Sequence, residues 1–538
     1  MPNLPNVRNE TYRLLRALGL TTIFGNPGST ELRFLQDFPA DFRYILGLHE
    51  GAVVSMADGY AQATGKAAFV NLHTAPGVGN ALGAIIAAYY GKAPLVITAG
   101  QQVRPMMLME PWLFAREFTE VPKPFVKWSY EPARAADVPG AIARAYHIAM
   151  QPPRGPVFVS IPMDDWDAEC NPLPSHTVTT RVAPDPTALD TVTTLLHEST
   201  RPALVIGAGV DRAGARDAAI ALAERTHAAV WGAPEYERAG FPEDHPQFVG
   251  FLPSAMAPLA EKLAAYDCVL ALGAPIWHYY PYVPGPIVPE GTALVQFTDD
   301  PDEAARAPAG MAVVGDVGLA LAHLLHAIPA PRTLFDASTR LLPTPRPTPD
   351  VPPATMPISP AFVMHTLDTV MPADTVYFFE SPSNRAAQQR HLRIRREGGY
   401  FVTPSGGLGY AMAAAVGAQI AQPERQAVAL LGDGSSVYTI QALWTAAQEG
   451  AAAIFVIFNN GGYGVLKAFA NFVGARNVPG LEVPGLDLCQ IARGFGCDAH
   501  RITRPEEIAD ALRAATAARV PTLLDIIVDA TVPDLVAK

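Results

Sequence analysis

Short apolar runs alternate with alanine-rich segments of helical periodicity along the whole chain. Each third of the sequence contains four such runs, which are TTIFGNPG, AAFVNLH, PLVITAG and PVFVSIP, then PALVIGAG, AAVWGAP, DCVLALGAP and TALVQFT, then TVYFFES, QAVALLGDG, AAIFVIFNN and TLLDIIV. Strands that are apolar on both faces and alternate with helices are typical of parallel sheets covered on both sides. The pattern predicts an α/β protein of three doubly wound parallel-sheet domains, with ligands at the carboxyl ends of the strands.

Prolines mark the expected boundaries between these domains. Eight prolines fall among the eighteen residues 343–360, a density that predicts an extended linker and not a helix. A weaker break spans residues 171–190. We therefore expect domains at residues 1–180, 185–340 and 355–538, and the first and third are candidates for a shared topology.

Composition excludes several classes of protein. A chain of 538 residues is too long for one hydrophobic core, and 49% hydrophobic with 17% charged residues is typical of a globular enzyme. The net charge of −12, without a basic cluster, argues against a nucleic-acid partner. The four cysteines are scattered without a CxxC pair, and no apolar run is long enough for a signal core or a membrane span. We therefore expect a cytoplasmic protein with no membrane partner.

The stretch LLGDGSSVY places an acid between two glycines where an apolar strand ends and a helix begins. Gly432 and Gly434 allow a sharp turn and let a ligand approach the backbone closely around Asp433. Ser435 and Ser436 are candidate caps of the following helix, whose N-terminus favours an anion. A GDG triplet alone is more often a plain strand-to-helix turn, so its meaning depends on the residues that converge on it.

Asn460 is the residue that changes this interpretation. It follows Asp433 by 27 residues, ends the next apolar run and precedes the bend GGYG. If the two strands are neighbours, the Asp433 carboxylate and the Asn460 amide oxygen converge on one point. Two oxygen ligands beside an anion-binding helix start suit Mg²⁺, which keeps waters and bridges to substrate phosphates. The backbone carbonyl of Gly462 is a candidate third ligand.

GDGSS and FNN together are similar to the diphosphate-binding motif of thiamine diphosphate-dependent enzymes. Other stretches resemble the benzoylformate decarboxylase-like family of 2-keto acid decarboxylases across all three domains, among them GNPGSTELRFLQDFPADFRYILGLHE, DGYAQA, TAGQQ, VKWSYEPA, DDWD, ALWTAAQ and NVPGLEVPGLD. The resemblance implies a pyrimidine-binding first domain, a Rossmann-like middle domain and a diphosphate-binding third domain. It also implies a site between two subunits, in a homodimer at minimum and usually a homotetramer.

The implied activity is the non-oxidative decarboxylation of benzoylformate, a small 2-keto acid, to benzaldehyde and CO₂. The implied cofactors are thiamine diphosphate and Mg²⁺, for which Ca²⁺ is a possible substitute. Relatives of the acetolactate synthase type bind FAD in the middle domain. Nothing in this sequence demands that cofactor, so FAD is not expected.

Glu50 follows the strand-like run YILGLH, and taken alone it is an ordinary helix-start carboxylate. The matching glutamate of the family hydrogen-bonds the pyrimidine ring, so the resemblance implies a catalytic role. Leu408 in SGGLGY matches the bulky residue that bends the cofactor, and the Gly406 carbonyl matches the acceptor for its amino group. Pro382 replaces a small hydroxylic residue of the family. The other implied cofactor contacts are Ser381, Ser383, Gly432, Asp433, Gly434, Ser435, Asn460, Gly462, Tyr463 and Gly464.

Two residues of the first domain are candidates for handling the substrate. Ser29 in NPGST is either a turn serine or, by the resemblance, a neutral donor to the substrate carboxylate. His73 ends an apolar run before a glycine-rich turn, and such a histidine is often structural. It matches the family's proton-relay histidine, and an imidazole suits that task because it titrates near neutral pH.

The middle domain departs from the family at its second histidine. In GAPIWHYYPYVPG an ungapped match places Tyr280 at that position, with His278 two residues earlier. Positions i and i+2 of an extended segment face the same way, so either His278 or Tyr280 is the candidate proton donor. An aromatic loop that packs on its neighbour is the third interpretation. Weaker proton donation would slow aldehyde release and favour carbon–carbon ligation.

The resemblance also places a substrate pocket, formed by Ser29, Trp112, Leu113, Tyr280, Leu466 and Phe469. A large apolar lining favours an aryl or branched 2-keto acid over pyruvate. Trp112 replaces a leucine of the family and is expected to narrow the pocket. The alternative is that these side chains belong to the hydrophobic core, as leucine and phenylalanine usually do.

Two other functions compete with decarboxylation of benzoylformate. A thiamine diphosphate-dependent carboligase or aldehyde lyase, or a decarboxylase of branched or other 2-keto acids, keeps the cofactor and changes the reaction or the substrate. A nucleotide-binding oxidoreductase or a silent regulator rests only on the glycines of VIGAGVDRAG, residues 205–214. This motif lacks the full glycine fingerprint, so it is a weak signal.

Overall fold

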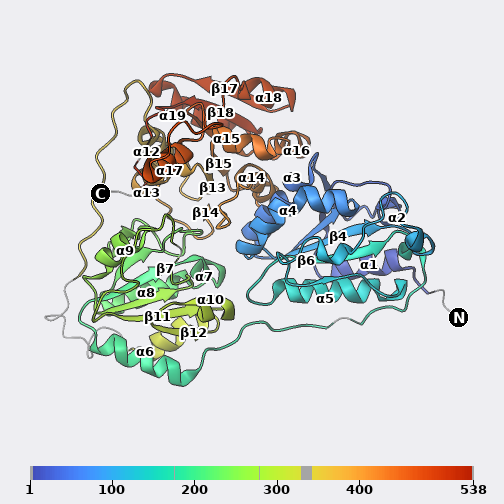
Figure 1. Ribbon diagram of the computed structural model, residues 1–538, viewed down its shortest axis with the longest axis horizontal. Helices are drawn as coiled ribbons and strands as arrows, with labels where there is room; N and C mark the ends of the chain where they lie inside the picture. Colours follow the sequence, from blue (N-terminus) through green and yellow to red (C-terminus); the bar gives the residue numbers. More distant parts are fainter. Residues whose placement is uncertain (1–3, 175, 278, 329–341, 533, 536–538) are drawn as a thin grey trace.

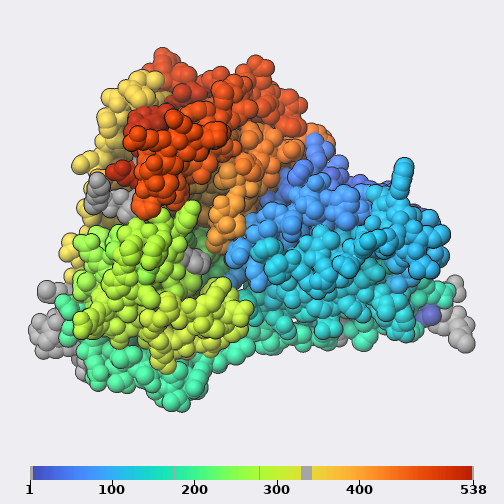
Figure 2. Space-filling model, in the orientation of Figure 1, coloured from blue at the N-terminus to red at the C-terminus, as the bar shows by residue number. Residues whose placement is uncertain are grey.

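The computed structural model describes residues 4–174, 176–277, 279–328, 342–532 and 534–535. Their strands form three six-stranded sheets, and every strand pair in them is parallel. Helices cover the sheets, and the three sheets form three lobes (Figures 1 and 2). The predicted fold class is confirmed. The exact domain boundaries stay a prediction.

The first sheet has the strand order β2-β1-β3-β4-β6-β5. Its strands are β1 (Thr22–Gly25), β2 (Arg43–Leu46), β3 (Ala68–Leu72), β4 (Leu95–Gln101), β5 (Ser129–Tyr130) and β6 (Val157–Pro162). Its helices are α1 (Val7–Ala17), α2 (Leu32–Leu35), α3 (Glu50–Thr64), α4 (Thr74–Tyr90) and α5 (Val138–Met150). The inner strands β3, β4 and β6 are buried at every position, which explains their unbroken apolar runs.

The third sheet repeats the order of the first, as β14-β13-β15-β16-β18-β17. Its strands are β13 (Val376–Glu380), β14 (Tyr400–Phe401), β15 (Ala427–Gly432), β16 (Ile454–Asn459), β17 (Asp498–Ile502) and β18 (Thr522–Ile527). Its helices are α12 (Pro360–Val370), α13 (Arg385–His391), α14 (Ala411–Ala421), α15 (Asp433–Ser436), α16 (Ala442–Glu449), α17 (Gly464–Val473), α18 (Leu488–Gly494) and α19 (Ile508–Ala518). The shared topology of the first and third domains is confirmed.

The middle sheet has a different order, β12-β11-β10-β7-β8-β9. Its strands are β7 (Pro202–Ile206), β8 (Ala229–Gly232), β9 (Phe248–Phe251), β10 (Cys268–Leu272), β11 (Ala293–Thr298) and β12 (Met311–Val314). Its helices are α6 (Pro186–Glu198), α7 (Ala208–Arg212), α8 (Arg216–Thr226), α9 (Met256–Leu263), α10 (Pro301–Arg306) and α11 (Val317–Ala327). The strand order reverses between β7 and β10, as in a Rossmann-type domain.

Two extended segments connect the lobes. The described residues from 171 to 185 run along the lower edge of Figure 1 without helix or strand and end at α6. Residues 342–359 likewise contain no helix or strand, and α12 starts at Pro360, where a missing N–H costs no helical hydrogen bond. The proline-rich stretch is therefore an extended connection, as predicted.

The first and third domains share one hydrophobic core across α3 and α14. The two helices touch backbone to backbone at two glycines. A methyl group at Gly59 would lie 2.0 Å from the Ala414 oxygen, and one at Gly417 would lie 1.8 Å from the Met56 oxygen. No side chain fits in such a gap, so the contact fixes the first domain rigidly against the third.

Candidate active site

Asp433 begins α15 directly after β15, and Asn460 follows the neighbouring strand β16. In the register of these strands Gly432 pairs with Phe458, so both polar residues project from the same edge of the third sheet. The Asp433 Oδ1 atom accepts the Gly434 N–H at 2.9 Å, and the Asn460 Oδ1 atom accepts the Gly462 N–H at 3.2 Å. The predicted adjacency of the two strand ends is correct.

The second oxygen of Asp433, Oδ2, is buried and has no hydrogen-bond partner. The residue is 2% exposed. Burial raises the pKa of this carboxyl, and the backbone N–H groups of Gly434, Gly461 and Gly462 oppose that shift. An unpaired buried oxygen is costly unless a ligand takes its free lone pairs.

The start of α17 packs closely against this edge. A methyl group at Gly464 would lie 2.9 Å from the Ser383 Oγ atom and 3.0 Å from the Asn460 Nδ2 atom, and one at Gly434 would lie 2.4 Å from the Tyr463 ring. The Gly462 carbonyl accepts the Gly464 N–H at 3.2 Å. The structure therefore gathers Ser383, Tyr463 and Gly464 around Asp433 and Asn460. A methyl group at Gly432, in contrast, would meet nothing closer than 3.6 Å.

Glu380 ends β13 and organises the loop that contains Gly406 and Leu408. Its carboxylate accepts the N–H groups of Gly409, Tyr410 and Ala411 at 2.7, 2.7 and 2.8 Å. Its carbonyl oxygen accepts the Ser435 Oγ–H at 2.9 Å. Burial raises the pKa of the Glu380 carboxyl to about 7, against the effect of the three N–H donors.

The other residues of the third domain that the sequence predicts to contact the cofactor differ in exposure. Ser381 is buried, and its Oγ accepts from the Asn384 amide at 2.8 Å. Leu408 is half-buried, and Gly406 is exposed with a φ of +70°. A positive φ at Gly406 explains why glycine stands there.

Three neighbouring strands of the first sheet end in the first-domain candidates. Ser29 follows β1, Glu50 follows β2 and His73 follows β3. In the third sheet, too, polar candidates follow three neighbouring strands, with Ser381 after β13, Asp433 after β15 and Asn460 after β16, a set displaced by one strand in the shared order.

His73 is oriented by Glu31, a residue that the sequence did not single out. The His73 Nδ1 atom lies 2.9 Å from Glu31 Oε2 and 3.1 Å from Thr30 Oγ1. Glu31 is 1% exposed and also accepts the Gly28 N–H at 2.9 Å and the Gly100 N–H at 3.0 Å. A carboxylate at this position places the proton on Nδ1 and leaves Nε2 as the acceptor of the neutral ring.

Glu50 is half-buried at the first position of α3. Its Oε2 atom accepts from the Asn80 amide on α4 at 3.1 Å, and Gly77 on the same helix leaves space beside Oε1. Among the described residues no hydrogen bond or ion pair joins Glu50 to the strand ends of the third sheet.

The predicted pocket residues form two groups. The rings of Tyr280 and Phe469 pack in a tilted arrangement with centroids 4.7 Å apart, and Leu466 lies one turn earlier than Phe469 on α17. Trp112 is 93% exposed, although the sequence suggested a pocket lining. Leu113 is also exposed, with a φ of +65°. Neither is in the core. The predicted donor His278 lies outside the described residues.

Three family models match the chain, and they agree with the three sheets. The thiamine pyrophosphate enzyme N-terminal TPP binding domain matches residues 5–113, the central domain matches residues 189–324 and the C-terminal TPP binding domain matches residues 383–526. The fold and these three matches thus define a thiamine pyrophosphate-dependent enzyme. Within this class, the chain belongs to the benzoylformate decarboxylase family, and the expected family is confirmed.

The relatives that establish this membership match over nearly their full length. A benzoylformate decarboxylase of Pseudomonas aeruginosa is 46% identical, over 97% of this chain and 99% of the relative. The crystal structure of benzoylformate decarboxylase from Polynucleobacter necessarius has a TM-score of 0.95 at 40% identity and covers 99% of this chain and 100% of its own. A thiamine diphosphate-dependent 4-hydroxybenzoylformate decarboxylase of Rhodococcus jostii RHA1 has a TM-score of 0.93 at 42% identity, with coverage of 98% and 100%.

None of the helices in the described part of the chain is both long and apolar enough to cross a membrane.

Proposed function

We propose that the protein decarboxylates an aromatic 2-keto acid, with benzoylformate as substrate and benzaldehyde and CO₂ as products, using thiamine diphosphate and Mg²⁺. The observation that carries the proposal is that candidate polar residues gather after three neighbouring strands both in the first sheet and in the third. Near-full-length similarity to benzoylformate decarboxylase supports the choice of substrate. We also propose a cytoplasmic location, where the four buried cysteines would stay reduced.

The residues of the third domain fit a metal-bound diphosphate. Asp433 Oδ2 is a buried oxygen without a partner, and Asn460 Oδ1 and the Gly462 carbonyl are two further oxygens at the same edge. We assign these three as the metal ligands, since Mg²⁺ prefers oxygen ligands. Gly432 has space for a methyl group within the protein, so a ligand lying against the backbone is the better reason for glycine there.

Other side chains of the third domain would hold and orient the cofactor. Ser381, Ser383 and Ser435 would lie around the diphosphate, and Tyr463 and Gly464 would start the helix beside it. Leu408 would support the bend between the two rings, and the Gly406 carbonyl would accept from the amino group. Glu380 holds the end of this loop through three N–H groups and so positions Leu408.

Thiamine diphosphate, when bound, supplies the carbon nucleophile that adds to the keto carbon and the electron sink that decarboxylation needs. Glu50 would exchange a proton with a pyrimidine nitrogen, held in place by the Asn80 amide. Ser29 would donate to the substrate carboxylate. His73 would move a proton at Nε2, because Glu31 fixes its Nδ1 proton.

We further propose that each site is completed by a second copy of the chain. Among the residues that the structure describes, Glu50 forms no hydrogen bond or ion pair with the third-sheet edge of its own chain, and Trp112, at 93% exposed, needs an apolar surface to cover it. The exposed face of α17, with Leu466 and Phe472, is such a surface. A homodimer that joins these surfaces, paired into a tetramer, would enclose the apolar pocket of Leu113, Tyr280 and Phe469 and favour an aryl substrate.

One assay series tests the activity. The purified protein with thiamine diphosphate and Mg²⁺ is given benzoylformate, phenylpyruvate, branched 2-keto acids and pyruvate, and CO₂ and aldehyde are measured. We expect benzoylformate to give the highest kcat/KM. CO₂ release from none of these acids would reject the proposal.

A carboligase is the second candidate, and the middle-domain loop favours it. Tyr280 stands where the family has a histidine, and its ring lies against Phe469 at 4.7 Å. A phenol is a weaker acid than an imidazolium at neutral pH, which would slow aldehyde release. Benzoin formed from benzaldehyde alone, faster than benzaldehyde from benzoylformate, would favour this candidate.

A further inference from the structure

A second polar cavity, of about 240 Å³, lies where the three domains meet. It is lined at one side by the last residues of α3, whereas Glu50 begins that helix. At 1.5 Å per residue, the 15 residues of α3 separate the two ends by about 20 Å. Pro94 and Arg425 also line the cavity, and they precede β4 and β15, so it lies at the amino edges of sheets whose carboxyl edges form the proposed active site.

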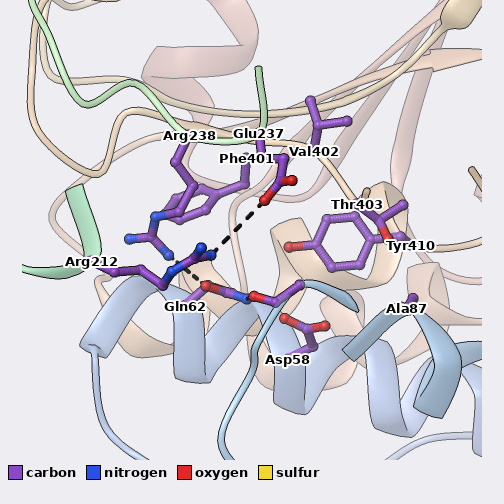
Figure 3. Close-up of a pocket in the computed structure, with 11 residues that line it drawn as sticks. Asp58, Gln62, Ala87, Arg212, Glu237, Arg238, Phe401, Val402, Thr403 and Tyr410 are labelled. Atoms are coloured by element: carbon purple, nitrogen blue, oxygen red, sulfur yellow. Dashed lines mark hydrogen bonds and ion pairs between the residues drawn. The ribbon is translucent and has the colours of Figure 1, made fainter. Parts of the chain in front are cut away.

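Positive charge dominates the walls of this junction cavity. Every domain contributes at least one cation, and the five cations are Lys92, Arg154, Arg212, Arg238 and Arg425. Only two carboxylates, Asp211 and Glu397, line it. Figure 3 shows the guanidinium groups of Arg212 and Arg238 side by side above Gln62, on the wall that the cavity shares with a smaller neighbouring pocket. The lining therefore has an excess of three positive charges.

Two of the five cations are neutralised within the protein. Lys92 lies 2.7 Å from Glu303 and 3.1 Å from Asp300, and Arg238 lies 2.5 Å from Asp211. The Lys92 pairs join the first domain to the middle domain, and the Arg238–Asp211 pair lies within the middle domain. Both leave little charge to attract a ligand.

The other three arginines have weaker or neutral partners. Arg212 is 3.9 Å from Glu237, and its Nε atom is buried without a hydrogen bond. Arg154 donates to the Gly65 carbonyl at 3.0 Å. Arg425 donates to the Asp374 carbonyl and to Gln422, while its second terminal nitrogen, Nη2, is buried without a partner.

The positive charges of this lining repel one another, and Glu237 and Glu397 offset only part of them. Burial, followed by the charges of Arg212 and Arg238, lowers the pKa of Arg154, and burial lowers the pKa of Arg425. Three buried or half-buried guanidinium groups that face one cavity raise the free energy of the folded protein unless an anion lies between them. The guanidinium groups of Arg154, Arg212 and Arg425 that line the cavity would donate to such an anion.

We propose that the junction cavity binds a small multivalent oxyanion, either a phosphate group or a dicarboxylate, that links the three domains. Guanidinium groups bind carboxylate and phosphate oxygens in pairs, which suits Arg154, Arg212 and Arg425 better than a monovalent halide. The volume of about 240 Å³ favours a small anion over a dinucleotide. This site is separate from the proposed diphosphate site, so its test does not depend on catalysis.

The test uses the holoenzyme, saturated with thiamine diphosphate and Mg²⁺. Thermal unfolding is measured with increasing inorganic phosphate, malonate or chloride at constant ionic strength, and equilibrium dialysis counts the bound phosphate. The variants are Arg154→Gln and Arg425→Gln. The matched control is Arg513→Gln, which removes an exposed arginine of α19 in the same domain as Arg425.

We expect phosphate or malonate, but not chloride, to raise the melting temperature of the wild type saturably, and the more effective anion identifies the ligand class. Each cavity variant should bind that anion about tenfold more weakly, since one charge-assisted contact is lost. In chloride the cavity variants should melt no lower than the wild type, because a repulsive charge is gone. Arg513→Gln should behave as the wild type in every anion.

Three results would overturn the proposal. They are equal stabilisation of the wild type by chloride, dialysis without a saturable phosphate site on the wild type, and an unchanged anion affinity in both cavity variants. The dialysis of the wild type remains decisive if a variant does not fold.

Discussion

Asp433→Asn should weaken cofactor retention without destabilising the cofactor-free protein. Asp433 is 2% exposed, and its Oδ2 atom has no partner within the protein, so without cofactor this carboxylate is buried and poorly satisfied. Asparagine keeps the Oδ1 acceptor for the Gly434 N–H at 2.9 Å and removes the negative charge. Because a single substitution acts in opposite directions on the free and the loaded protein, it distinguishes a ligand site from a structural turn.

The magnitudes follow from burial and from ligand linkage. A buried polar atom without a partner lowers the free energy of unfolding by about 1–3 kcal/mol. The asparagine amide keeps part of that penalty, so we expect the cofactor-free variant to be more stable than the wild type by on the order of 1 kcal/mol at pH 8. For a domain of this size that gain is about 2–4 °C in melting temperature. A ligand at a hundredfold excess over its Kd stabilises by about 2.7 kcal/mol, so the wild type should gain about 5–10 °C with thiamine diphosphate and Mg²⁺. The variant should lose most of that shift.

The pH dependence has a defined sign. Burial raises the pKa of Asp433, so the folded protein holds this proton more tightly than the unfolded chain. The wild type therefore loses stability as the pH rises from the ordinary carboxyl pKa through the raised one, and the advantage of the variant grows over the same window. Differential scanning fluorimetry at pH 5 and pH 8, with and without cofactor, measures both effects.

The control is Asp487→Asn, which changes an N-cap carboxylate of α18 in the same domain. This control variant should show the same rise in melting temperature with thiamine diphosphate and Mg²⁺ as the wild type. Two results would refute the reasoning: a full cofactor shift in Asp433→Asn, or a cofactor-free variant that melts several degrees below the wild type.

Three further predictions follow from the same geometry. Glu50→Gln should lower kcat by about a hundredfold or more, with an unchanged melting temperature, since general acid–base catalysis contributes about 10²–10⁴-fold; stopped assays of benzaldehyde release check this, and a near-wild-type rate excludes Glu50 from the mechanism. Glu31→Gln should lower kcat more than it changes KM and should shift the pH profile of kcat. In the double variant with His73→Ala it should add little to the loss of kcat caused by His73→Ala alone, because the Glu31 carboxylate acts through the His73 ring. Additive losses of kcat would show that the two residues act independently. Gly434→Ala should destabilise the cofactor-free protein by about 1–3 kcal/mol, because the methyl group meets the Tyr463 ring at 2.4 Å. Gly432→Ala should leave the stability of the cofactor-free protein unchanged and weaken only cofactor binding, as measured by thermal shift and titration. A cofactor-free Gly432→Ala variant less stable than Gly434→Ala would contradict this packing.

The predicted strands show what a pattern of apolar residues can and cannot reveal. All four inner strands of each sheet were predicted, because burial on both faces gives an unbroken apolar run. Of the six edge strands only β2 was predicted. The edge strand β17 has the sequence DAHRI with three exposed positions, so it lacks the apolar run of a buried strand. The strands β5 and β14 have two residues each, which is too short for any periodic pattern to show.

The candidate site was predictable to the extent that it depends on strand ends. Asp433 and Asn460 follow apolar runs directly, and the pairing of β15 with β16 brings them to one edge. Glu31 and Glu380 escaped notice as positioning residues because their partners, His73 and the backbone from Gly409 to Ala411, lie 29 to 42 residues away. A glutamate two residues after Ser29 was the only available signal for the first of them.

Complementation between two inactive variants tests the central claim, that Glu50 of one chain and Asp433 of its partner act on the same cofactor. Glu50→Gln and Asp433→Asn homodimers are each expected to be inactive. After subunit exchange, half of randomly formed dimers would be hybrids with one intact site each, so we predict recovery of about a quarter of the wild-type rate of benzaldehyde release. A mixture as inactive as its components, under conditions in which labelled subunits demonstrably exchange, would contradict the shared site.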